Sequence, residues 1–93
     1  MEKPERKKYK IIIRKKAQKN LLKIPLPWRS RIAKAIDLLE DDPFLGEKMW
    51  GKFKNCFKIR IWPYRIIYKV FENGNLIYIQ RIDHCGAAYT GKI

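Results

Sequence analysis

Three cations lie close together on two segments that have the residue pattern of β-strands. In 56–62, apolar residues alternate with Lys58 and Arg60, so the two kinds of side chain would point to opposite faces. A Trp-Pro pair then interrupts the run, because proline has no N–H to donate to a ladder. The pattern resumes over 64–71, with Arg65 just after the turn. The sequence therefore predicts a β-hairpin that gathers the three cations on one small surface.

Such a cluster suits the cleavage of RNA without a metal ion. The ribose 2′-OH attacks the adjacent phosphate, which requires a base, positive charge on the developing phosphorane and an acid at the leaving 5′-oxygen. Like charges disfavour the protonated form of a crowded lysine, so Lys58 is a candidate base or electrostatic stabiliser. Arg60 and Arg65 have planar guanidinium groups suited to phosphate oxygens. His84 is a candidate acid, because histidine exchanges protons near neutral pH.

Each of these residues also has a structural interpretation. Lys58 and Arg60 are compatible with a solvated strand face. Arg65 is placed to cap the hairpin or to pair with Glu72. A lone histidine such as His84 is more often structural than catalytic. Two cysteines and one histidine are too few for a structural zinc site, which takes four ligands, so no metal or other cofactor is expected.

The chain as a whole is short and strongly basic. Its 93 residues favour a single domain over 1–93, with the polar residues 1–8 as a flexible lead-in. The formal net charge of +13 indicates a polyanionic partner, nucleic acid first, with an anionic membrane surface or an acidic protein as alternatives. No apolar run approaches the ~20 residues of a membrane span, and the charged start is unlike a signal peptide. We therefore expect a cytoplasmic protein with no membrane partner, whose cysteines are reduced thiols.

Apolar periodicity predicts the elements that would position the hairpin. A strand is expected at 9–14, helices at 15–24 and 27–41, a loop at 44–55, and strands at 56–62, 64–71 and 76–82. The order β-α-α-β-β-β predicts an α+β fold, an antiparallel sheet with an N-terminal helical hairpin packed on one face. Lys58 and Arg60 should then lie on the face that the helices leave open.

The order and spacing of several segments resemble the RelE/ParE toxin superfamily, over 9–89. The most specific are Phe57-Lys58-Ile59-Arg60, Tyr64-Arg65-Ile66-Ile67-Tyr68, and the run from Ile82-Asp83-His84 to Tyr89. The resemblance implies a compact, RelE-like α+β toxin of a type II toxin–antitoxin pair, neutralised by a cognate antitoxin protein. RelE-type members cleave mRNA in the ribosomal A site, whereas ParE-type members share the fold and act on DNA gyrase.

The resemblance also implies roles for individual residues. Lys58, Arg60 and Arg65 match the basic catalytic residues of the RelE type. The C-terminal tyrosine of that pattern matches Tyr89, which would stack on a base or orient the 2′-OH. Many relatives have a His-Arg pair shortly before that tyrosine, and here an arginine is replaced by Cys85.

Three further cations are candidates for contacts with RNA. Arg81 has the same strand parity as residue 85 and is a candidate replacement for the missing arginine, although it lies four residues, or ~13 Å, along the strand. Lys52 and Lys54 precede the hairpin in a segment rich in lysine and aromatic residues. Aromatic residues interleaved with cations suit single-stranded RNA, but packing in the core is the commoner use of such aromatics.

These observations predict a metal-independent endoribonuclease that cleaves mRNA in the ribosomal A site and inhibits translation. Its predicted partners are the antitoxin, the ribosome and mRNA. One alternative is a ParE-like toxin that inhibits gyrase and has no chemistry of its own. Another is a weakened RelE homologue that only binds RNA or antitoxin, because Cys85 replaces the expected arginine.

Overall fold

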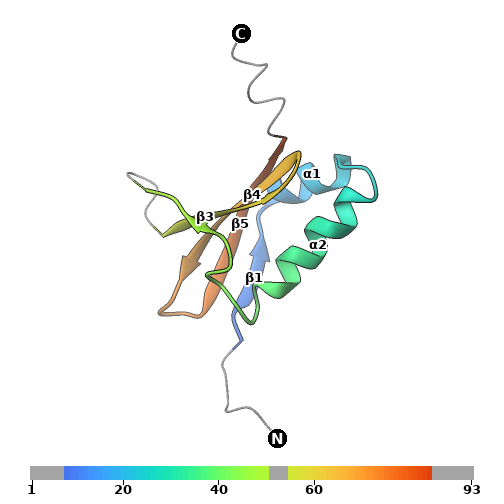
Figure 1. Cartoon of the computed structure of the whole chain (residues 1–93). Coiled ribbons are helices and arrows are strands. Elements are labelled where there is room, and N and C mark those ends of the chain that lie inside the picture. The colour runs from blue at the N-terminus through green and yellow to red at the C-terminus, as the bar shows by residue number, and fades with distance from the viewer. Residues whose placement is uncertain (1–7, 51–54, 85–93) are drawn as a thin grey trace, which may run out of the picture.

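The computed structural model describes residues 8–50 and 55–84, and within them two helices and five strands follow one another (Figure 1). The elements are β1 Lys10–Ile13, α1 Lys15–Lys23, α2 Trp28–Leu38, β2 Glu47–Lys48, β3 Cys56–Ile61, β4 Tyr64–Phe71 and β5 Leu76–His84. This arrangement confirms the predicted α+β fold. It adds one short strand, β2, inside the segment 44–55 that was expected to be a loop.

The five strands form one sheet in the order β1-β5-β4-β3-β2. The pairs β2–β3, β3–β4 and β4–β5 are antiparallel, as expected for consecutive strands. In contrast to the expected antiparallel sheet, β1 joins the outer edge of β5 and runs parallel to it. The sequence pattern could not reveal this, because parallel and antiparallel strands share the same two-residue alternation of side chains.

Both helices pack on the same face of the sheet. The second helix ends at Leu38, earlier than the expected Asp41, and the chain continues in a tighter turn. The N–H groups of Leu39 and Glu40 donate to carbonyl groups only three residues back, at 3.1 and 3.2 Å. Three acidic residues follow at 40–42, where the helix dipole disfavours anions. Neither described helix is long and apolar enough to cross a membrane.

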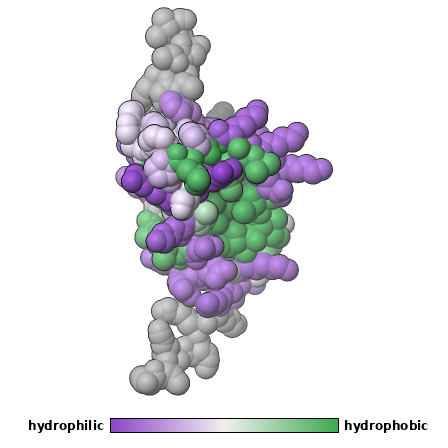
Figure 2. Space-filling model, turned by 90° about the vertical axis from the view of Figure 1, so that its right-hand side faces the viewer, coloured by the Kyte–Doolittle hydropathy of each residue, from purple (hydrophilic) through white to green (hydrophobic). Residues whose placement is uncertain are grey.

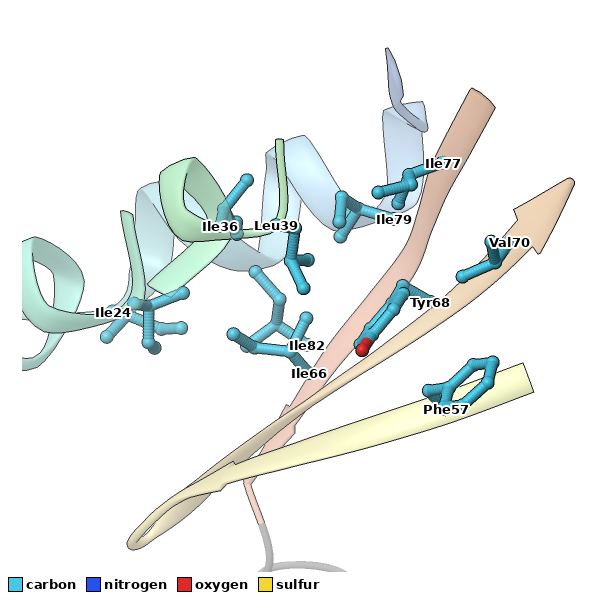
Figure 3. Close-up of a cluster of buried hydrophobic side chains, with 12 residues drawn as sticks. Ile24, Ile36, Leu39, Phe57, Ile66, Tyr68, Val70, Ile77, Ile79 and Ile82 are labelled. Atoms are coloured by element: carbon cyan, nitrogen blue, oxygen red, sulfur yellow. The ribbon is translucent and has the colours of Figure 1, made fainter. Parts of the chain in front are cut away.

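A single apolar core fills the space between the helices and the sheet (Figure 3). Its buried members are Ala17, Ile24, Ile32, Ile36, Leu39, Phe57, Ile66, Tyr68, Val70, Ile77, Ile79 and Ile82. In β4 the core residues Ile66, Tyr68 and Val70 occur at every second position, as expected for one face of a strand. The core therefore fixes which side chains of β3, β4 and β5 point away from the helices.

Tyr68 holds the loop that leads into β2. Its hydroxyl donates a hydrogen bond to the Pro43 carbonyl oxygen at 3.0 Å and accepts one from the Gly46 N–H at 2.9 Å. Gly46 passes so close to β3 that an added Cβ would lie 2.5 Å from the Lys58 carbonyl oxygen. These contacts place the following residue, Glu47, opposite Lys58 in the sheet. Two residues are too few to show a strand periodicity, so sequence analysis missed this element.

Burial raises the pKa of Tyr68 to about 12, so its neutral hydroxyl is strongly favoured in the folded protein. The pKa of tyrosine in an unfolded chain is about 10. A raised folded-state pKa gives stability that is fully present below the unfolded value and is lost as the pH rises through the folded value. The contribution of Tyr68 is therefore complete at neutral pH and disappears between about pH 10 and 12.

We predict that Tyr68→Phe lowers the free energy of unfolding by about 1–3 kcal/mol at pH 7, because the backbone groups of Pro43 and Gly46 lose their partner. Urea denaturation of the two proteins measures this difference. Tyr78→Phe is a matched control, since no hydrogen bond of the Tyr78 hydroxyl is seen among the described residues. Equal losses in the two variants would show that the Tyr68 hydroxyl does not stabilise the loop.

Candidate nucleic-acid interface

The sheet face opposite the helices, here named the open face, carries most of the predicted site. Register pairs Arg60 with Arg65 and Arg65 with Asp83, so these residues form one row across three strands. A second row consists of Lys58, Ile67 and Arg81. Neighbours in a row have Cα atoms about 4.5–5.5 Å apart. Four cations from three strands therefore converge on this face, and both helices lie on the other side of the sheet (Figure 1).

Ile67 is a buried apolar residue on the open face. It is 6% exposed, yet it does not belong to the core beneath the helices. Its register partners are Lys58 and Arg81, whose aliphatic stems are suited to cover it while their charged ends reach water.

Asp83 links two arginines of the open face. Arg81 Nε donates a hydrogen bond to Asp83 Oδ2 at 3.0 Å, and Arg65 Nη2 lies 4.0 Å from the same oxygen. Arg65 therefore pairs with Asp83 rather than with Glu72, the partner considered from the sequence. Arg65 Nε is buried and has no hydrogen-bond partner among the described residues. Asp83 was not among the predicted site residues, although its strand parity with Arg81 could have identified it.

Glu47 is the second carboxylate of the site. Its Oε1 lies 4.0 Å from Lys58 Nζ, and the side chains of Glu47 and Lys58 are 70% and 24% exposed. Lys58 therefore faces a carboxylate as well as cations. The sequence pattern does not reveal Glu47 as a site residue, because it predicts a loop for the segment that contains β2. The carboxylate adds a proton-accepting group beside the predicted base.

His84 lies on the other side of the sheet from the four cations. Its register partner is Tyr64, and the two rings meet edge to face with centroids 5.0 Å apart. Tyr64 in turn contacts Trp28 of α2, with ring centroids 6.3 Å apart. The structure thus places His84 with the aromatic residues on the helix side and does not bring it to Lys58, Arg60 and Arg65.

Several predicted residues lie outside the described part of the chain. They are Lys52, Lys54, Cys85 and Tyr89, and their predicted roles stay predictions. Within 8–50 and 55–84, no group of three or more His, Cys, Asp and Glu side chains could hold a metal ion. The described arrangement, four cations with two carboxylates on the sheet face opposite the helices, is suited to bind an anion with several oxygen atoms, such as a phosphodiester.

Solved structures of toxins from bacteria and archaea have the same fold. RelE in the RelE–RelB complex of Pyrococcus horikoshii OT3 is 26% identical, with a TM-score of 0.76 over 85% of this chain and 97% of that chain. The isolated Escherichia coli RelE toxin is 18% identical, with a TM-score of 0.75 over 91% and 99%. A chain of the RelBE2 toxin–antitoxin complex of Mycobacterium tuberculosis is 23% identical, with a TM-score of 0.72 over 83% and 91%.

Sequence comparison identifies the family. No curated protein matches the chain significantly. A family profile described as the ParE toxin of type II toxin–antitoxin systems, parDE, matches residues 11–89, which is most of the chain. The chain therefore belongs to the ParE toxin family, within the RelE/ParE superfamily of toxins from toxin–antitoxin systems.

Proposed function

We propose that this toxin is a RelE-like endoribonuclease that cleaves mRNA in the ribosomal A site. The observation that supports this most is the convergence of Lys58, Arg60, Arg65 and Arg81 on the sheet face opposite the helices. Guanidinium groups bind phosphate oxygens in pairs, and fixed positive charge stabilises the extra negative charge of a phosphorane. Such a face can therefore favour the transition state of phosphodiester cleavage without a metal ion.

The proposed reaction is an attack of the ribose 2′-oxygen on the adjacent phosphorus. The new bond forms as the bond from phosphorus to the 5′-oxygen breaks, leaving a 2′,3′-cyclic phosphate and a free 5′-hydroxyl. In one version, Glu47 accepts the 2′-proton and a protonated Lys58 donates a proton to the leaving 5′-oxygen. In the other, a neutral Lys58 accepts the 2′-proton and then donates it to the leaving 5′-oxygen. Arg60 and Arg65 neutralise the phosphorane, while Asp83 positions Arg81 beside them.

The proposed protein partner is an antitoxin. Similar toxins are seen in RelE–RelB complexes, and the helix side of this chain exposes Leu22, Leu26 and Leu38. Figure 2, which views that side, shows apolar surface among the charged side chains. Exposed apolar patches of this kind mark protein interfaces.

The ribosome is the second proposed partner. The net charge of +13 would add affinity for ribosomal RNA. A toxin that acts on ribosomes would work in the cytoplasm.

Gyrase inhibition is the second candidate function, and the match to the ParE profile favours it. The two functions differ in their first effect on a cell. We predict that induction without antitoxin lowers labelled amino-acid incorporation before any DNA-damage signal rises. The measurement follows both signals over time after induction, with an uninduced culture as control. A DNA-damage signal that precedes the fall in translation would favour gyrase and contradict the proposal.

A further inference from the structure

The open face continues beyond the four cations into a pair of aromatic rings. Tyr78 and Phe71 meet edge to face, with ring centroids 5.4 Å apart. The Arg14 guanidinium lies 5.9 Å from the centre of the Tyr78 ring, and Lys69 Nζ lies 5.4 Å from the centre of the Phe71 ring. We name these four residues the aromatic end of the open face. In this group each aromatic ring has a cation on one side and the other ring on the other, in the order Arg14, Tyr78, Phe71, Lys69.

A β-bulge brings Tyr78 to this face. On β5, Tyr78 and Arg81 are three residues apart, so regular alternation would put them on opposite faces. The register of β4 with β5 shifts between Ile67 and Tyr68 and leaves Gln80 without a partner, so that Tyr78 pairs with Lys69. Tyr78 therefore shares a face with Arg81, a placement that sequence parity hides.

The aromatic end is close enough to the four cations to belong to one binding surface. Lys69 follows Arg65 by four residues on β4, which is a distance of ~13 Å along the strand. Both side chains point away from the helices, because Ile66, Tyr68 and Val70 between and beside them fill the core. Phe71 is 36% exposed and Tyr78 is half-buried. A ligand that extends from Arg65 along β4 would reach both rings.

The charge of the face indicates what kind of ligand this is. Among the described residues, this face carries two carboxylates, Glu47 and Asp83, and a larger number of cations that includes Arg14, Lys58, Arg60, Arg65, Lys69 and Arg81. An apolar protein segment would leave most of these charges without a partner. Aromatic rings interleaved with cations are the composition of surfaces that bind single-stranded nucleic acid, where bases stack on rings and cations follow the backbone.

We propose that the aromatic end binds nucleotides of single-stranded RNA that flank the cleaved phosphate. One base stacks on the ring of Tyr78, which Phe71 contacts edge to face, while Arg14 and Lys69 contact the backbone. The position of the cleaved phosphate at Arg60 and Arg65 rests on the proposed function. The binding itself does not require cleavage, so the two ideas can fail separately.

The test is the affinity of the full-length chain for 2′-O-methyl oligoribonucleotides, which cannot be cleaved by 2′-attack. Fluorescence anisotropy at fixed salt gives the dissociation constants for an eight-nucleotide and a three-nucleotide strand. Tyr78→Leu is expected to weaken binding of the longer strand about tenfold, because stacking on one aromatic ring contributes about 1–3 kcal/mol. Binding of the shorter strand should not change. Tyr78→Phe, which keeps the ring, should bind both strands as the original chain does.

A second pair of variants tests the cations of this surface. Lys69→Gln is expected to weaken binding of the longer strand, whereas Lys34→Gln, on the exposed side of α2, should not. Thermal melting of each variant identifies any that does not fold. If Tyr78→Leu does not fold, the comparison of Lys69→Gln with Lys34→Gln tests the inference.

Three results would overturn the inference. One is binding of the longer strand by folded Tyr78→Leu within twofold of the original chain. Another is that Tyr78→Leu loses as much affinity for duplex RNA as for the longer single strand. The third is that Tyr78→Leu loses affinity for the antitoxin and none for RNA. Absence of ribosomal cleavage by the original chain would count against the proposed function and leave this comparison unchanged.

Discussion

Replacing Lys58, Arg60 and Arg65 together with alanine is expected to abolish toxicity and mRNA cleavage. Removing one fixed group that stabilises transition-state charge typically costs 10²–10³-fold in rate, about 3–4 kcal/mol. The three side chains share one face and act on one phosphate in the proposed reaction, so their effects are not additive. We expect the triple variant to lose at least ~10³-fold in cleavage rate, which single-turnover cleavage on ribosomes measures.

The fold should survive this change, because none of the three residues belongs to the core beneath the helices. The matched control is the alanine variant of Lys15, Lys16 and Lys19, which removes the same charge from exposed positions of α1. Circular dichroism and thermal melting of both variants separate loss of structure from loss of chemistry. A folded Lys58/Arg60/Arg65 variant that still arrests growth would show that the site lies elsewhere.

The second large effect is the salt dependence of RNA binding. For single strands, the logarithm of affinity falls with the logarithm of salt concentration with a slope of about −0.7 per neutralised phosphate. If four to six of the open-face cations contact phosphates, a fourfold rise in salt should weaken binding by about 50–300-fold. Dissociation constants of a non-cleavable single strand at several salt concentrations give this slope.

Charge-removing variants test whether this salt dependence arises from the open face. Exchange of Lys58, Arg60 and Arg65 for glutamine should make the slope shallower by about 2, whereas exchange of Lys15, Lys16 and Lys19 should change it little. Equal changes in the two variants would mean that RNA binds the whole basic surface. In that case the open face would not be the binding site.

The sequence predicts the hairpin well, because its signal is local. Alternation over 56–62 and 64–71 fixes which side chains share a face, so the placement of Lys58, Arg60 and Arg65 follows from the pattern. The bulge in β5 has no such signal, since it depends on the register with β4. That bulge determines that Tyr78 and Arg81 share a face.

The carboxylates of the site were harder to predict, because their contacts depend on tertiary structure. Glu47 reaches Lys58 only because Tyr68 and Gly46 hold a two-residue strand against β3. His84 illustrates the opposite case. Its chemistry suggests a catalytic acid, but its register pairing with Tyr64 of the neighbouring strand places it on the helix side. Residue type alone therefore predicts candidates, and the strand register decides which of them meet.

The most direct test of the central claim is cleavage of a defined mRNA by the purified chain on ribosomes, with the new 5′ ends mapped. We predict cuts confined to the A-site codon and absent without ribosomes. The Cys85→Arg variant, measured in parallel, shows whether the residue that differs from many relatives limits the rate. Absence of cuts with both proteins, together with inhibition of gyrase supercoiling, would contradict the account and identify a gyrase toxin.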